Sequence, residues 1–215
     1  MHPFRYPEST HSRTQAPGLF ADYRRYKPFL RLEFQRQCVY CRLPDGLKGE
    51  DAFGVDHYRP VALFPEVSSD YGNLFYSCNS CNRRKRDFWP TREQWSRGAF
   101  LPNPCDHTMS EHLQFSGTLV HAASQAGTLA IDLLMLNESE AILFREFILR
   151  SIDRCLTEAA SILELLVALG PRLQRAKGPD REDIQRDIDK LRANLSQVDQ
   201  DFERLTGTRL PGPSR

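Results

Sequence analysis

Apolar residues repeat at alternating spacings of four and three over much of the last third of the chain. This heptad pattern is typical of a helix that packs along one seam against another helix. Between the two patterned stretches, Gly178 suits a helix end and Pro179-Asp180 suits a helix start. We therefore predict an antiparallel helical hairpin over about residues 138–206. Its two seams consist of Ile148, Ile152, Cys155, Ala159, Ile162, Leu166, Leu169 and Leu173, and of Ile184, Ile188, Leu191, Leu195, Val198, Phe202 and Leu205.

Shorter and less regular patterns mark the first half of the chain. Residues 20–37 carry apolar positions at helical spacing, which predicts a short helix that Pro28 interrupts or starts. Residues 53–61 predict a short strand, and residues 74–89 predict a turn followed by a helix. Short strands or loops are expected between residues 113 and 130. The pattern therefore favours an α+β fold followed by a mainly helical region.

Composition divides the chain into three segments. Residues 1–19 are rich in Pro, Ser, Thr and His, so we expect a flexible N-terminal arm. A domain that carries most of the motifs would follow at 20–115, and a mostly helical C-terminal domain at 116–215. The sequence has no apolar run long enough to span a membrane and no apolar core of a secretory signal. We therefore expect no membrane partner and a cytoplasmic location, where paired cysteines bind metal more often than they form disulfides.

Charge is unevenly distributed although the net charge is only +1. Residues 1–104 hold 16 basic against 11 acidic side chains, and the remaining residues hold 13 against 17. A basic excess in the first half suits a polyanionic partner, DNA or RNA. An excess of this size is common, however, so the charge distribution alone decides little.

Four of the six cysteines fall into two C-x2-C pairs, Cys38/Cys41 and Cys78/Cys81. Four thiolates in two such pairs are the ligand set of a closed, tetrahedral, structural Zn²⁺ site. The linker between the pairs exceeds the roughly 15–20 residues of a simple zinc ribbon, so it must contain an element of its own. The alternative is four buried free thiols, but two such pairs seldom arise by chance. Cys155 belongs to the helical seam, and the sequence assigns no role to Cys105.

Side chains suited to hydrolysis lie between and beside the cysteine pairs. Asp56-His57 lies within the predicted strand, near its end at Pro60, Asn73 lies before the second pair, and Asn82 follows Cys81. Histidine can act as a general base near neutral pH, and the oxygen atoms of Asp and Asn bind hard cations. An Asp-His pair alone is a weak signal, because a satisfied surface pair is the more common explanation.

The stretch VDHYRP…YGNLFYSCNSCNRRK resembles the HNH endonucleases, or ββα-metal nucleases, in their zinc-containing branch. The resemblance covers about residues 34–90 and includes the cysteine pairs, the D-H-x-x-P element and the C-N-x-x-K ending. It implies a hairpin followed by a helix around one catalytic Mg²⁺ or Mn²⁺, beside a four-cysteine zinc knuckle. It also implies that His57 is the general base, Asp56 a metal ligand and Asn73 the residue that orients the base. Asn82 takes the third position of the family's three-residue motif, where it would be a catalytic residue and a metal ligand. The site is therefore H-N-N in type.

Basic residues near these positions are candidate phosphate ligands. Four of them follow Asn82 directly, and another lies two residues after His57. Four successive cations cannot share one face of a helix, so only some would reach a nucleic acid. The alternative is a solvated charge cluster. The candidate nucleic-acid contacts are Arg59, Arg83, Arg84, Lys85 and Arg86.

Nearby aromatic and histidine residues suit more than one role. Phe88, Trp89 and Trp95 would stack on bases or form the core of the small domain, and the core is favoured. His107 and His112 invite a second site, but no cysteine pair or asparagine flanks them. A structural role is therefore favoured for both histidines.

Two functions from different classes follow from these features. The first is a metal-dependent HNH endonuclease that hydrolyses phosphodiester bonds of DNA, in one strand or both. The second is a non-catalytic zinc knuckle that binds nucleic acid or protein. The helical extension resembles, in layout only, nuclease subunits of bacterial anti-phage systems that act beside an ATPase. A hairpin with a heptad seam is most often a self-packed support, but such a seam also suits a homodimer or a protein partner. On the resemblance, that partner would be an ATPase subunit.

Overall fold

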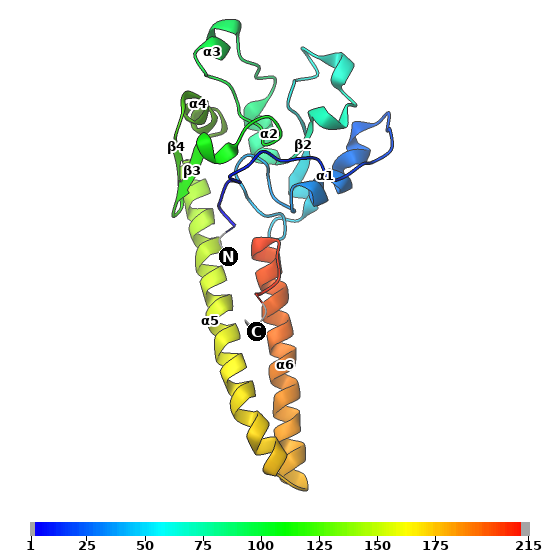
Figure 1. Ribbon diagram of the computed structural model, residues 1–215, viewed down its shortest axis with the longest axis vertical. Helices are drawn as coiled ribbons and strands as arrows, with labels where there is room; N and C mark the ends of the chain where they lie inside the picture. Colours follow the sequence, from blue (N-terminus) through cyan, green and yellow to red (C-terminus); the bar gives the residue numbers. More distant parts are fainter. Residues whose placement is uncertain (1–2, 212–215) are drawn as a thin grey trace. The chain divides into compact units, whose positions relative to one another are not determined.

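Short helices and two-stranded sheets form the first part of the protein, and two long helices form the rest (Figure 1). The computed structural model describes residues 3–211, which divide into two units between Glu146 and Phe147. The fold is α+β followed by a helical hairpin, as predicted. Its helices and strands are α1 (Lys27–Glu33), β1 (Phe53–His57), β2 (Leu74–Cys78), α2 (Asn79–Lys85), α3 (Arg92–Ser96), β3 (Leu113–Ser116), β4 (Leu119–Ala122), α4 (Gln125–Leu134), α5 (Ser139–Arg175) and α6 (Pro179–Thr206).

β1 and β2 form an antiparallel hairpin, and α2 begins directly after it. Phe53 pairs with Cys78 at one end of the ladder, and His57 pairs with Leu74 at the other. A strand at β2 contradicts the turn that the apolar pattern predicted for residues 74–78. All five residues of β2 are buried, so the strand lacks the alternation that marks a half-exposed strand. The hairpin-helix arrangement is the one implied by the family resemblance.

Aromatic side chains make the core of this hairpin. Phe53 stacks on Tyr76 with ring centroids 5.1 Å apart, and Phe75 lies 5.5 Å from Phe34, which follows α1. All four rings are buried. The core therefore holds α1 against the sheet that carries the candidate site.

One buried carboxylate fixes the chain before α1. Glu33 accepts hydrogen bonds from the amides of Thr14 and Gln15 at 2.7 and 2.9 Å, and it also contacts His11 and Tyr71. Burial raises the pKa of Glu33, but these hydrogen bonds outweigh it and lower the pKa to about 2. Residues 3–19 contain no helix or strand, yet they are attached to the folded unit rather than solvated along their length. Arg13 and Tyr6 add hydrogen bonds to the carbonyl oxygens of Leu74 and Tyr40. Composition missed this attachment because its partners lie far away in the sequence.

The β3–β4 hairpin and α4 complete the first unit. The strands lie where short strands were expected, and α4 packs on β4. Gly127 permits that packing, because a Cβ atom there would lie 1.9 Å from the carbonyl oxygen of His112. The first unit extends to Glu146, and the boundary that composition predicted lies after residue 115.

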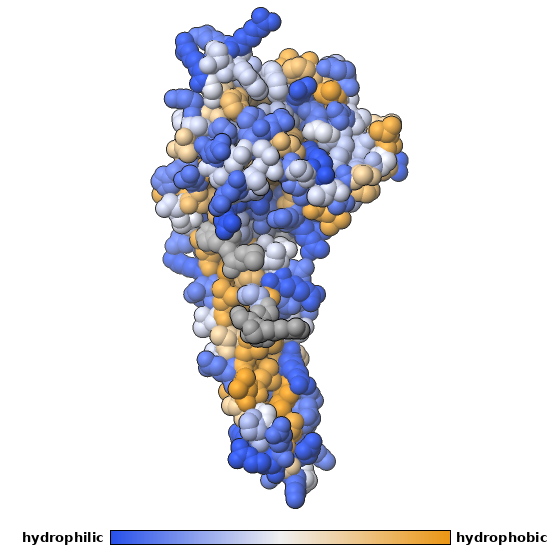
Figure 2. All heavy atoms as spheres, viewed as in Figure 1, coloured by the Kyte–Doolittle hydropathy of each residue, from blue (hydrophilic) through white to orange (hydrophobic). Residues whose placement is uncertain are grey.

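In the second unit, α5 and α6 run antiparallel along the predicted seam (Figure 1). Ala159, Ile162 and Val198 form its buried cluster, with Leu166 and Leu195 among the residues packed around them. Gly178, with φ of +57°, precedes the first turn of α6, and Pro179 begins that helix, as predicted. Figure 2 shows apolar side chains gathered along the visible face of these helices. No helix within residues 3–211 combines the length and the apolar character needed to cross a membrane.

Candidate functional site

The four cysteines of the two C-x2-C pairs converge in the first unit. Cys38 and Cys41 come from the segment after α1, Cys78 ends β2, and Cys81 lies on α2. Their sulfur atoms all lie within 4.8 Å of one another, with 3.7 Å between those of Cys41 and Cys78. Tetrahedral Zn²⁺ with bonds of about 2.3 Å places sulfur atoms about 3.8 Å apart. The cluster therefore has the dimensions of a closed metal site.

The electrostatics of the cluster also suit a cation. Burial raises the pKa of Cys38, but hydrogen bonds from the other three cysteines outweigh it and lower the pKa well below its usual value. The hydrogen bond with Cys38 and its negative charge raise the pKa values of Cys41 and Cys81. Four clustered sulfurs, three of them in buried cysteines, cannot all ionise without a neutralising charge, and a divalent cation would supply it.

His57, the last residue of β1, is held between two groups. Its Nε2 lies 2.8 Å from the carbonyl oxygen of Ser68, and the ring of Tyr23 meets it edge-on at 4.5 Å. A carbonyl oxygen only accepts hydrogen bonds, so Nε2 must carry the proton in this contact. In the neutral imidazole, Nδ1 is then unprotonated and can accept a proton. The geometry thus suits a general base.

Asn73 links the two segments that position His57. Its Oδ1 accepts from the amide of Arg59 at 2.8 Å, and its Nδ2 donates to the carbonyl oxygens of Arg59 and Val67. Arg59 lies two residues after His57, and Val67 precedes Ser68. Because Asn73 is buried and bonded to both segments, it can fix the imidazole without touching it.

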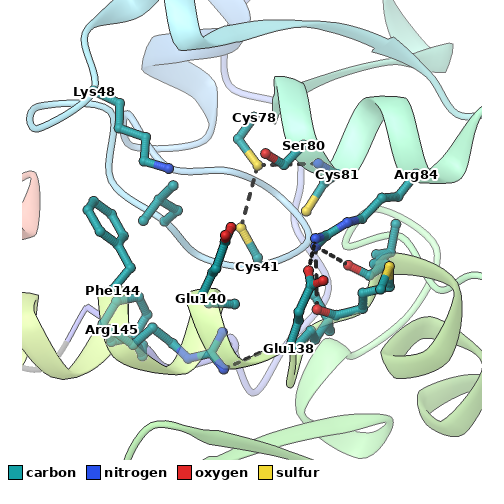
Figure 3. Close-up of a pocket in the computed structure, with 16 residues that line it drawn as sticks. Cys41, Lys48, Cys78, Ser80, Cys81, Arg84, Glu138, Glu140, Phe144 and Arg145 are labelled. Carbon is teal, nitrogen blue, oxygen red and sulfur yellow. Dashed lines mark hydrogen bonds and ion pairs between the residues drawn. The ribbon is translucent and has the colours of Figure 1, made fainter.

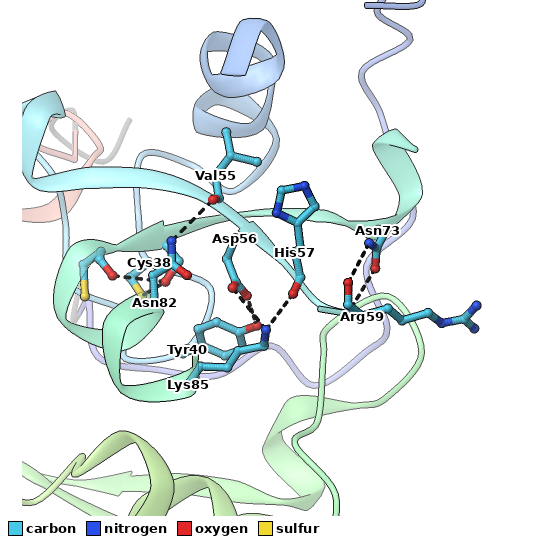
Figure 4. Close-up of polar contacts among 11 residues, drawn as sticks. Cys38, Tyr40, Val55, Asp56, His57, Arg59, Asn73, Asn82 and Lys85 are labelled. Atoms are coloured by element: carbon cyan, nitrogen blue, oxygen red, sulfur yellow. Dashed lines mark hydrogen bonds and ion pairs between the residues drawn. The ribbon is translucent and has the colours of Figure 1, made fainter. Parts of the chain in front are cut away.

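Asp56 points to the opposite side of β1 from the His57 ring (Figure 4). Its carboxylate accepts from Lys85 Nζ at 3.1 Å and from the Tyr40 hydroxyl at 2.5 Å. Lys85 also donates to the carbonyl oxygen of His57 at 2.6 Å. Burial, and then the charge of Asp56, raise the pKa of Tyr40 well above its usual value, so the phenol keeps its proton. The strand continues through His57, so Asp56 and His57 alternate sides as in any strand.

A second cation would depend on Asp56 and Asn82. Among residues 3–211, only the cysteine cluster groups three or more His, Cys, Asp or Glu side chains within reach of one ion. Asn82 Nδ2 lies 3.4 Å from the carbonyl oxygen of Val55, which leaves Oδ1 as the candidate ligand atom. Carboxylate and amide oxygens suit Mg²⁺ or Mn²⁺. The donor chemistry therefore fits a hard cation, which would compete with Lys85 for Asp56.

The five basic residues near the site occupy different environments. Lys85 is buried against Asp56, so its predicted contact with nucleic acid is wrong. Arg84 is half-buried, and Figure 3 shows it beside Glu138, with which it forms an ion pair. It also donates to the carbonyl oxygens that end α4, a favourable place for a cation. Arg59, Arg83 and Arg86 are exposed, so their side chains are free to meet a phosphate.

Several residues of the site could not be recognised as functional from the sequence. Tyr40, Ser68 and Tyr23 take part only because the fold brings distant segments together. Lys85 was identified from the sequence but given the wrong role, because three neighbouring arginines suggested that it belongs to an exposed basic cluster. His107 and His112 both engage Nδ1 in local hydrogen bonds, to Asn103 and Ser124 respectively.

Comparison with known proteins agrees with the geometry. Residues 38–88 match the family model for HNH endonuclease, so the resemblance expected from the sequence is confirmed for that segment. The chain is 26% identical to a Septu protein PtuB of Bacillus thuringiensis over 124 residues, which cover 55% of this chain and 45% of that protein. It is 24% identical to a Septu protein PtuB of Bacillus mycoides (strain KBAB4) over 196 residues, which cover 79% and 64%. The chain thus spans less than two thirds of the length of either relative, and no solved structure matches it significantly.

Proposed function

We propose that the protein is a metal-dependent endonuclease that hydrolyses phosphodiester bonds of DNA. One observation carries the proposal: within the segment that matches the HNH endonuclease family, His57 is fixed through Nε2 with Nδ1 left to accept a proton. A pure binding module has no use for an imidazole oriented in this way. The four-cysteine cluster would hold a structural Zn²⁺ that joins the segment after α1 to β2 and α2.

In this proposal His57 removes a proton from the attacking water, and Asn73 maintains the ring through Arg59 and Val67. Asp56 and Asn82 would hold Mg²⁺ or Mn²⁺, which supplies charge stabilisation at the phosphate and the leaving oxygen. The exposed Arg59, Arg83 and Arg86 would contact phosphates on either side, which makes binding salt-dependent. RNA carries the same phosphodiester group and is the second substrate to test.

We also propose a role in anti-phage defence in the cytoplasm, beside an ATPase subunit. The similarity to two Septu proteins PtuB and the helical hairpin after the nuclease segment both support this role. The hairpin would provide the contact with the partner or with a second copy of the chain.

Plasmid cleavage by the full chain tests the nuclease directly. We expect nicked or linear product with Mg²⁺ or Mn²⁺, none with EDTA, and a loss of at least about a hundredfold in His57→Ala. His121→Ala is the matched control, because His121 is an exposed histidine on β4 of the same unit. Cleavage by His57→Ala at the rate of the parent protein would contradict the assigned base. RNA of the same sequence, run in parallel, shows which nucleic acid is cut.

A zinc-knuckle module that binds without cutting is the second candidate. The observation that favours it is the buried Lys85–Asp56 pair, which already neutralises the carboxylate assigned to the metal. This function predicts that DNA is bound and no divalent metal supports cleavage. The plasmid experiment therefore separates the two candidates when DNA binding is measured alongside it.

A further inference from the structure

Five aromatic rings form a continuous series on the first unit, starting beside the candidate site. We name Phe64, Trp89, Trp95, Phe100 and His107 the aromatic strip. Trp89 meets Phe64 at 5.0 Å and Trp95 at 6.0 Å, and Phe100 meets Trp95 at 5.0 Å and His107 at 4.6 Å. Trp89 also packs edge-on against Tyr58 at 5.6 Å, and Tyr58 follows His57. The strip therefore leads away from the histidine assigned as the base.

The strip is not the hydrophobic core of the unit. The core rings of Phe53, Phe75 and Tyr76 are almost fully buried, whereas Trp95 is exposed and the other four residues of the strip are half-buried. Trp95 is 46% exposed, although tryptophan gains more than most residues from burial. Sequence alone favoured a core role for Trp89 and Trp95, but the β1–β2 hairpin already has a complete aromatic core without them.

Local structure holds Trp95 in a defined orientation. It lies on α3, which begins with a capping box in which Thr91 Oγ1 accepts from the Gln94 amide and Gln94 Oε1 accepts from the Thr91 amide. An ion pair of 2.6 Å between Arg97 and Glu93 spans the same turn. A ring presented by a capped helix loses little conformational freedom on binding, which favours a role in recognition.

Charge around the strip has a small positive excess. Arg86, Arg92 and Arg97 are exposed and lie on the segment that carries Trp89 and Trp95. Asp87 and Glu93 are also exposed there, and Glu93 pairs with Arg97. Arg86 and Arg92 are therefore the cations that can meet a polyanion. Aromatic rings in series beside cationic side chains are the features with which proteins bind single strands, because each unpaired base offers a face for stacking. A duplex does not offer those faces, since its bases stack on one another. We propose that the aromatic strip binds an unpaired stretch of nucleic acid next to the phosphodiester bond that is cut. This inference rests on the proposed function and names its substrate class.

Intrinsic fluorescence can test the strip, because the only two tryptophans of the chain are Trp89 and Trp95. Full-length His57→Ala, which removes the assigned base, is titrated with a single-stranded thymidine oligonucleotide and with a duplex of the same length. We expect the single strand to quench the fluorescence and to bind more tightly than the duplex, because stacked bases contact the rings directly. Equal affinity and equal quenching by both ligands would overturn the proposal.

A matched pair of variants separates ring stacking from apolar contact. In the His57→Ala background, Trp95→Leu keeps the apolar bulk and loses the ring, whereas Trp95→Phe keeps a ring. We expect Trp95→Leu to weaken single-strand binding about tenfold, measured by anisotropy of a labelled oligonucleotide, and Trp95→Phe to bind within about threefold of the parent. Leu119→Ala, which removes an exposed apolar side chain from β4, should bind like the parent. If Trp95→Leu also binds like the parent, the proposal is wrong.

Failure of this inference is distinguishable from failure of the proposed function. Absence of plasmid cleavage by the wild-type protein contradicts the nuclease and leaves the binding result intact. Cleavage with no preference for unpaired bases supports the nuclease and overturns the role of the strip.

Discussion

The helical hairpin and the β1–β2–α2 region are stabilised by different physics. Along α5 and α6, many apolar residues each contribute a small and similar amount of stabilising free energy. Each of them has the same packing role as its neighbours along the seam. Around β1, β2 and α2, a few polar groups and one cysteine cluster join segments distant in sequence. The loss of stability caused by a substitution should therefore be small and graded in the hairpin. At the candidate site, the loss caused by a single substitution should be large and abrupt.

Two spectroscopic signals separate the regions. Both tryptophans lie in the first unit, so their fluorescence follows that unit alone. Helices α5 and α6 contain most of the helical residues of the protein, so far-UV circular dichroism is dominated by the hairpin. The effect of a substitution on each region can therefore be measured separately in the full chain.

Removal of a cysteine from the cluster should have the largest effect. Structural zinc sites contribute on the order of 10 kcal/mol to folding, and a Cys78→Ser variant lacks one of four thiolates. We expect it to lose bound zinc and the cooperative fluorescence transition, while most of the helical signal is retained. Metal analysis and thermal melting with both signals provide the measurement. Cys105→Ser, at a cysteine outside the cluster, is the control, and a fully zinc-loaded Cys78→Ser with an unchanged melting curve would refute the zinc assignment.

Truncation of the Lys85 side chain should have the second-largest effect. We expect it to lower the free energy of unfolding by about 3–5 kcal/mol. The variant Lys85→Ala leaves the Asp56 carboxylate buried without its cationic partner, and such an unpaired charge is costly. Urea denaturation followed by tryptophan fluorescence measures the loss. Arg83→Ala, an exposed residue on the same helix, should change stability by about 0.5 kcal/mol or less. Equal effects of the two substitutions would mean that the Lys85–Asp56 pair does not stabilise the interior of the unit.

The Glu33 carboxylate should make the first unit sensitive to acid. Its folded pKa of about 2 lies below the usual 4.5, so its contribution is complete above about pH 4.5 and is lost as pH falls towards 2. A difference of this size corresponds to roughly 3 kcal/mol. Denaturation of Glu33→Gln at pH 7 and pH 3 should show a large loss at pH 7 and a smaller one at pH 3. Glu66→Gln, at an exposed glutamate, serves as control, and a pH-independent loss in Glu33→Gln would contradict the assignment.

The smallest effect is expected in the hairpin. Ile162 is buried in the α5–α6 seam, and Ile162→Val removes one methylene group at a cost of about 1 kcal/mol. We expect a small shift of the circular-dichroism transition with no change in tryptophan fluorescence. Val167→Ala, which removes a 76% exposed side chain from the same helix, should shift it less. A larger shift from Val167→Ala would mean that α5 packs through its other face.

Local sequence rules predicted some elements well and others poorly. The α5–α6 hairpin and its turn were predicted correctly, because heptad spacing and helix-end residues act within a few residues of the chain. Strand β2 was missed, because burial on both faces removes the pattern that identifies a strand. Composition could not show the close packing of α4 against the β3–β4 hairpin, which depends on Gly127 and lies within the unit that extends to Glu146.

Residue types at fixed spacings determined the chemistry available to this protein. The sequence by itself supplied four cysteines for one metal, the Asp56-His57 and asparagine set, and the helical seam, because each depends on spacing along the chain. Only the tertiary structure decided which way each side chain faces. It buried Lys85 against Asp56, fixed Nε2 of His57 on Ser68, and left the aromatic strip accessible. Those outcomes depend on contacts between distant segments, whose energies are set by burial and geometry in the folded protein rather than by local propensity.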